Sequence, residues 1–246
     1  MHCPPEQWLQ IEKHVWHMRA GGHIHRLFYD SEARLGIIKC IPSRAHELVK
    51  GLFECEFIVA VRAMNVNPAP LGATKFTSAN HSSREGDSTW QPVGRAPLGW
   101  PGLVIEVGYS QSLPSLGLAA RWWLESRPLI TTPGYNYGRV VQVILLNIIP
   151  HNHQIMIESW ILGPHPGRTR NSGNRPGVAI QSQPTITLTS RFDNNTNTYV
   201  TTSPGPFPLT ILWAAISENP PHAGQGNVVF GMNILQVIAD GLWPRI

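Results

Sequence analysis

One carboxylate inside an apolar run constrains this chain most. Residues 103–108 read Leu-Val-Ile-Glu-Val-Gly, with Pro-Gly before the run and Tyr-Ser after it. So short a β-branched run predicts a buried strand, on which Glu106 shares a face with Val104 and Gly108. A buried carboxylate is costly unless a cation, a metal ion or a hydrogen-bond donor lies opposite it. The sequence therefore predicts a partner for Glu106.

Composition limits the classes of protein to consider. The length of 246 residues suits one large domain or two small ones. A net charge of +4 and a pI near 9.2 are compatible with an acidic partner such as nucleic acid. Three cysteines argue against a disulfide framework and for an intracellular location, cytoplasmic or nuclear. We expect no membrane partner, because no secretory leader or membrane-length apolar segment is present.

Periodicity and capping signals predict an α/β fold with a mixed central sheet flanked by helices. The expected helices are 5–18, 43–64 with Ser43 as N-cap, 110–126 with Ser112 or Ser115 as cap, and 233–243. The expected strands are 25–29, 34–40, 74–77, 87–92, 103–108, 139–149 and 155–162, with a polar loop at 78–86. The run at 139–149 is so uniformly apolar that both its faces should be covered.

The composition changes at Gly163, which divides the chain into three predicted segments. These are a polar N-terminal segment (1–22), an α/β core (23–162) and an irregular extension rich in Pro, Gly, Ser and Thr (163–246) that ends in the terminal helix. Within the extension, residues 163–208 predict a long decorated loop or partial disorder, with one strand candidate at 185–189.

A second carboxylate precedes the central strand. Asp87 begins the expected strand 87–92, so if the two strands are neighbours, Asp87 and Glu106 converge at one edge of the sheet. Two such groups suit Mg²⁺ or Mn²⁺, which prefer carboxylate, carbonyl and water ligands. A metal held in this way lowers the pKa of a bound water and stabilises a phosphoryl transition state.

Several motifs give the chain a likeness to a known superfamily. They are PSRAHELV, GDSTWQP, WPGLVIEVGYSQSLPSL, ARWWLES and the pair RVVQVILLNI and IMIESW. Over roughly residues 24–162 the chain resembles the PD-(D/E)XK, or restriction-endonuclease-like, nucleases, and in particular a fungal lineage of them. The resemblance implies a restriction-endonuclease-like core and Mg²⁺-dependent (or Mn²⁺-dependent) hydrolysis of phosphodiester bonds in DNA or RNA.

The resemblance also assigns roles to individual residues. Asp87, Glu106 and the backbone carbonyl of Val107 would bind the metal, and Glu47 on the upstream helix would orient a metal-bound water. The usual lysine is missing, because its position is Gly108.

A cation would therefore have to come from elsewhere. Arg121 on the following helix and Lys75 one strand earlier are the candidates. An arginine can stabilise a phosphate but cannot act as a general base, since it stays protonated.

Other interpretations of these residues stay open. Glu106 can form a structural ion pair with Arg121 or Arg139, Asp87 can be a turn or cap residue, and Glu47 is favourable at any helix start. The missing lysine favours a catalytically degenerate nuclease fold that binds nucleic acid or protein. Histidine pairs at 14/17, 23/25 and 151/153 have ligand-like spacing for zinc, although no CxxC or HExxH element accompanies them.

Overall fold

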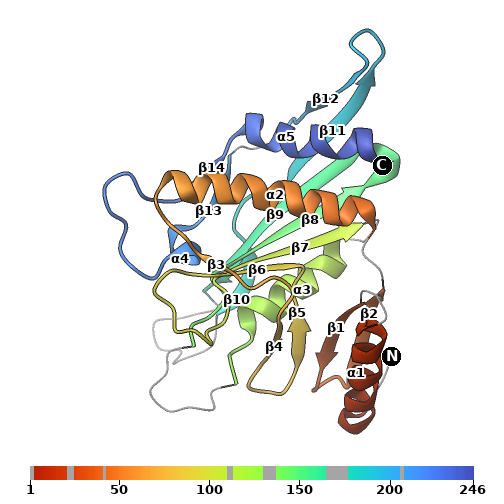
Figure 1. Cartoon of the computed structure of the whole chain (residues 1–246), viewed down its shortest axis with the longest axis vertical. Helices are drawn as coiled ribbons and strands as arrows, with labels where there is room; N and C mark the ends of the chain where they lie inside the picture. Colours follow the sequence, from red (N-terminus) through yellow and green to blue (C-terminus); the bar gives the residue numbers. More distant parts are fainter. Residues whose placement is uncertain are drawn as a thin grey trace.

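The strand that carries Glu106 lies in the middle of the main sheet. The computed structural model describes residues 3–20, 25–40, 43–109, 113–129, 137–164, 177–205 and 208–246. The main sheet has eight strands in the order β12-β11-β9-β8-β7-β6-β3, and β10 also pairs with β9 (Figure 1). The β7–β8 pair is parallel and the other described pairs of this sheet are antiparallel, so the predicted mixed α/β sheet is confirmed.

The strands of the main sheet have the following bounds. They are β3 (Ala69–Pro70), β6 (Ser88–Gln91), β7 (Leu103–Tyr109), β8 (Gln142–Ile149), β9 (Gln154–Gly163), β10 (Val178–Gln181), β11 (Ile186–Asp193) and β12 (Thr198–Thr202). A 3₁₀ turn, Pro150–Asn152, joins β8 to β9.

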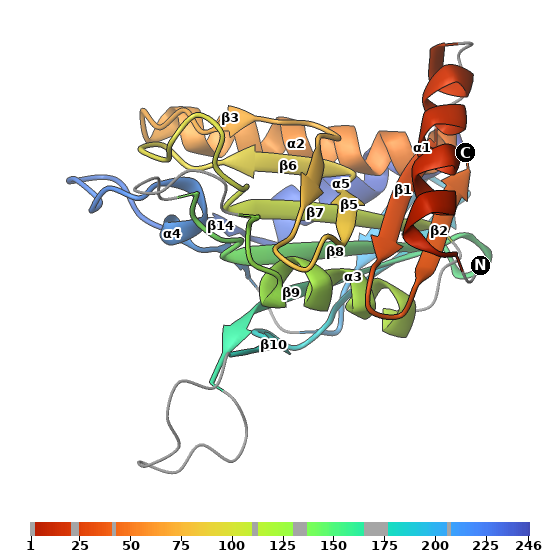
Figure 2. The same ribbon diagram turned by 90° about the horizontal axis from the view of Figure 1, so that it is seen from below.

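Helices cover both faces of this sheet. Helices α2 (Arg44–Ala63) and α5 (Met232–Leu242) lie on one face and α3 (Leu113–Glu125) lies on the other (Figures 1 and 2). Side chains alternate along β7, so Ile105 packs in the core below α2 whereas Val104 packs in the core below α3. Strand β8 is buried on both faces from Gln142 to Ile148, as its uniform hydrophobicity predicted.

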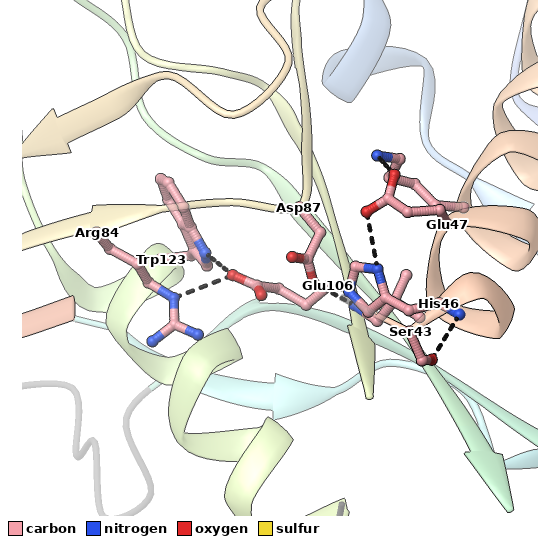
Figure 3. Close-up of polar contacts among 9 residues, drawn as sticks. Ser43, His46, Glu47, Arg84, Asp87, Glu106 and Trp123 are labelled. Carbon is pink, nitrogen blue, oxygen red and sulfur yellow. Dashed lines mark hydrogen bonds and ion pairs between the residues drawn. The ribbon is translucent and has the colours of Figure 1, made fainter. Parts of the chain in front are cut away.

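Helix α2 begins where its capping signal predicts. The Ser43 Oγ accepts a hydrogen bond from the backbone N–H of His46, which satisfies one of the N–H groups left over at a helix start. The apolar stripe of the helix is buried and includes Phe53 and Phe57, whose rings meet Phe230 and Trp90 edge to face. This stripe fixes the beginning of α2, with His46 and Glu47, beside the end of β7 (Figure 3).

A second, smaller sheet lies next to α3 and is called the N-terminal sheet here. Its strand order is β2-β1-β5-β4. The strands are β1 (His25–Asp30), β2 (Leu35–Cys40), β4 (Lys75–Thr77) and β5 (Ser83–Glu85). Helix α1 (Pro5–Ala20) packs on it through Trp8, which stacks on Tyr29 with ring centroids 5.1 Å apart.

The chain ends in elements that complete the core below α2. They are β13 (Leu209–Ile211), α4 (Trp213–Ile216), β14 (Val228–Phe230), α5 and a 3₁₀ turn at Trp243–Arg245. The predicted terminal helix is thus confirmed, one residue earlier at each end. None of the helices in the described ranges is long and apolar enough to cross a membrane.

Two stretches differ from the prediction. The expected polar loop 78–86 contains β5, whose sequence Ser-Arg-Glu has no hydrophobic alternation to mark it as a strand. Residues 163–208 were expected to be loop or disordered beyond one strand candidate, yet their described parts contain β10, β11 and β12. Polar, half-exposed strands of this kind are stabilised by pairing with a neighbour, which a local pattern does not show.

One predicted helix start falls partly outside the described ranges. Ser110 and Ser112 lie there, and Ser115 is not the cap of α3, because the helix already begins at Leu113.

Candidate functional site

Glu106 lies on β7, and Asp87, which was predicted to begin the neighbouring strand, lies one residue before that strand, β6. Ser88 forms the last pair of the β6–β7 ladder with Ile105, so Asp87 and Glu106 each lie next to this pair. Both residues are 3% exposed. The two carboxylates are therefore buried at the same edge of the β6–β7 pair.

Glu106 has the partner that its burial demands. Its Oε1 accepts a hydrogen bond from Arg84 Nε at 3.0 Å and another from Trp123 Nε1 at 2.7 Å (Figure 3). Both bonds reach the same oxygen, Oε1, and the described residues place no hydrogen bond on Oε2. The ion pair is with Arg84 on β5, so neither of the predicted partners, Arg121 and Arg139, is correct.

Asp87 is held by the backbone of β7 and by helix α2. Its Oδ2 accepts a hydrogen bond from the N–H of Val107 at 2.8 Å and lies 3.1 Å from Nε2 of His46. The side chains of Asp87 and His46 are each only 1% exposed. Asp87 is therefore a fixed group at the site, and the N–H of Val107 determines where its carboxylate lies.

Glu47 reaches this cluster only through His46. Its Oε1 lies 3.1 Å from Nδ1 of His46, and its Oε2 accepts a hydrogen bond from Lys50 (Figure 3). Burial by itself would raise the pKa of Glu47, but Lys50 and His46 outweigh burial and hold that pKa below its usual value. At neutral pH Glu47 is thus a charged, half-exposed residue one side chain removed from Asp87.

The predicted cations lie in different places. Lys75 forms an ion pair with Glu12 on α1, at 2.6 Å, and does not line the cavity described below. Arg121 is exposed on α3 and does line it. Arg139 donates to the carbonyl of Leu124 at 3.5 Å; burial, with Arg127 nearby, lowers its pKa.

A cavity of about 940 Å³ lies between α3 and the N-terminal sheet. Both acids line it, as do Glu85, which is 6% exposed, and Arg84. Six carboxylates and three guanidinium groups line the cavity in all, which gives a formal charge of −3. The negative balance favours a bound cation, and the size lies within the range of ligand sites in proteins.

Sequence reasoning missed three members of this site. Arg84 and Glu85 fall in the segment predicted as a loop, and no role was predicted for His46. A signal for Arg84 did exist, because a buried Glu106 requires a cation or donor. The sequence does not say which of the 19 lysines and arginines supplies it.

The donor set limits the kinds of metal site that fit. Among the described residues, no three or more His, Cys, Asp or Glu side chains converge as metal ligands. A cation at Asp87 and Glu106 would need backbone and water oxygens to complete its shell, as Mg²⁺ commonly does.

The histidine pairs give no support to zinc. The ring of His153 packs against Tyr199 and Trp243, with centroids 5.6 and 5.3 Å away. His23 and the side chains of His17 and His25 lie outside the described residues.

Comparison with known proteins adds no assignment: no family model and no curated protein matches the chain.

Proposed function

We propose that the protein is a metal-dependent nuclease that hydrolyses phosphodiester bonds in DNA or RNA at the cavity beside α3. One observation carries this proposal. Glu106 is a buried carboxylate that lines the cavity, and its Oε2 accepts no hydrogen bond from the described residues. A carboxylate oxygen in this position can serve as a metal ligand, and Asp87 lies next to the same end of the β6–β7 ladder.

Asp87 and Glu106 would hold the metal, with the backbone carbonyl of Val107 as a further ligand. Carboxylates in a cavity with a formal charge of −3 fit a hard divalent cation such as Mg²⁺ or Mn²⁺. When bound, the metal would supply an activated water and neutralise charge on the phosphate.

Arg84 takes the part of the missing lysine in this proposal. Its Nε holds Glu106, and its side chain lines the cavity, where the remaining N–H groups can donate to phosphate oxygens. Because arginine stays protonated, the proton of the attacking water must pass to a carboxylate or to solvent. His46 and the Val107 N–H act as positioning groups, since they fix Asp87 rather than face the substrate.

A second candidate is a nuclease fold that binds nucleic acid without cutting it. The observation that favours it is that each acid already has a partner, Arg84 for Glu106 and His46 for Asp87. If these pairs are permanent, no metal enters and the cavity only binds.

Cleavage assays separate the two candidates. The purified chain is incubated with plasmid and single-stranded substrates in Mg²⁺, in Mn²⁺ and in EDTA. The nuclease proposal expects metal-dependent cleavage that is lost in Asp87→Asn and in Glu106→Gln but kept in the exposed control Glu6→Gln. Absence of cleavage by the wild type, or cleavage by both site variants, contradicts it.

A further inference from the structure

We infer that the substrate is single-stranded, and that the cavity accepts an unpaired base against Phe28 and Trp122 while the phosphate lies beside Arg84. This inference rests on the proposed function and adds the form of the nucleic acid to it.

An aromatic wall stands next to the charged part of the cavity. Phe28 on β1 and Trp122 on α3 both line it and meet edge to face, with ring centroids 6.2 Å apart. The guanidinium of Arg84 lies over one face of the Phe28 ring, 5.0 Å from its centroid, so a base would contact the part of the ring that Arg84 leaves uncovered. The group proposed to bind phosphate and a ring able to contact a base are therefore adjacent, as sites for single strands require.

The wall is extended by apolar side chains that water reaches. Leu35 and Ile37 on β2 and Leu118 on α3 line the cavity and are 38%, 48% and 64% exposed. Exposed apolar residues gathered around one cavity indicate a ligand with an apolar face. A nucleobase has two such faces, whereas a phosphate or a bare cation has none.

Trp122 offers a hydrogen bond as well as a surface. Its Nε1 is buried and has no acceptor among the described residues. Buried donors nearly always have a partner, so an acceptor on a bound ligand would satisfy it. The oxygens and ring nitrogens of a nucleobase are acceptors of this kind.

A duplex does not fit this arrangement. Its bases are stacked and paired, so their faces are hidden unless a nucleotide leaves the stack. A single strand exposes its bases and can enter a space of about 940 Å³ one or two nucleotides at a time.

Equilibrium binding tests the inference without requiring cleavage. Fluorescence anisotropy is measured with labelled dT12, with U12 and with the dT12·dA12 duplex, in Ca²⁺, which takes the same oxygen ligands as Mg²⁺. We expect one of the two single strands to bind at least about tenfold more tightly than the duplex, and the dT12 and U12 arms tell DNA from RNA. Phe28→Ala should weaken that binding by about five- to a hundredfold, the usual effect of removing a stacking residue.

Three further variants make the result specific. Phe28→Tyr keeps the ring and should retain affinity, and Phe192→Ala is the control, because Phe192 is a 49% exposed aromatic on β11 away from the cavity. If Phe28→Ala does not fold, Leu118→Asp places a charge on an exposed part of the wall and should weaken single-strand binding instead.

Equal affinity for the duplex, or no effect of either wall variant, overturns the inference even if the protein cuts duplex DNA. Preferential single-strand binding without metal-dependent cleavage supports the inference and contradicts the nuclease.

Discussion

Replacing Arg84 with methionine tests directly how the buried carboxylate is held. The substitution keeps an unbranched side chain but removes the guanidinium that donates to Glu106 at 3.0 Å and covers Phe28. The Glu106 side chain is 4% exposed, and among the described residues it would then keep only the hydrogen bond from Trp123. The charge is left partly uncompensated.

The expected cost follows from this geometry. Removing one member of a buried ion pair destabilises a protein by about 3–5 kcal/mol. The lower end applies here, since Arg84 is 17% exposed and Trp123 remains, so we expect about 3 kcal/mol, including the lost contact with Phe28. For a chain of this size that corresponds to a fall in Tm of about 6–12 °C.

Thermal and urea unfolding of the four proteins of a double-mutant cycle measure this loss in the free energy of unfolding. In Arg84→Met, the second change Glu106→Gln removes the charge and keeps an acceptor for Trp123, so it should restore about 2 kcal/mol. A loss below about 1 kcal/mol in Arg84→Met, or a double variant no more stable than the single one, would show that this ion pair does not compensate the buried charge.

Three further predictions concern parts of the fold around the site, each checked by urea unfolding. Gln142→Ala should cost about 3 kcal/mol, because this buried side chain links β9 to the segment 208–212 through three hydrogen bonds of 2.8 Å. Its amide nitrogen donates to Ser159 Oγ and to the Thr210 carbonyl, and its amide oxygen accepts from the Leu212 N–H. Gly102→Ala should cost about 1–3 kcal/mol, since a Cβ would lie 2.4 Å from a carbonyl oxygen of α4, whereas Gly51→Ala in α2 meets nothing within 4 Å and should gain about 0.5–1 kcal/mol. Lys50→Gln should cost less than about 1 kcal/mol at pH 7. Because the pKa of Glu47 is lowered in the folded state, the contribution of this pair is present above the unfolded pKa of glutamate and is lost as the pH falls through the lower folded pKa.

The sequence predicted the central part of the fold because the signals there are local. The apolar run of β7, the Ser43 cap of α2 and the buried stripe of α3 each depend on neighbouring residues only, and all three are confirmed. The need of Glu106 for a partner is also local, since it follows from burial of a charge on an apolar strand.

The identity of the partners could not be predicted in the same way. Arg84 comes from a short polar strand that exists only because it pairs with β1 and β4. Trp123 is buried in the core, and its N–H donates to Glu106 because α3 packs against β7. His46 meets Asp87 because α2 begins beside the end of the sheet. These are tertiary contacts, and no spacing in the chain encodes them.

The roles implied for Glu47, Asp87, Glu106, Val107, Arg121 and Lys75 stay predictions. Asp87 and Glu106 are both buried next to the same end of the β6–β7 ladder, whereas Lys75 forms an ion pair with Glu12.

Binding of Mn²⁺, followed by calorimetry and by its paramagnetic resonance signal, tests most directly whether two acids hold one ion. The wild type should bind one Mn²⁺ per chain, displaced by excess Mg²⁺, and the affinity should be lost in both Asp87→Asn and Glu106→Gln but kept in Glu6→Gln. No binding by the folded wild type, or binding unaffected in both site variants, would mean that Arg84 and His46 are the permanent partners of these carboxylates.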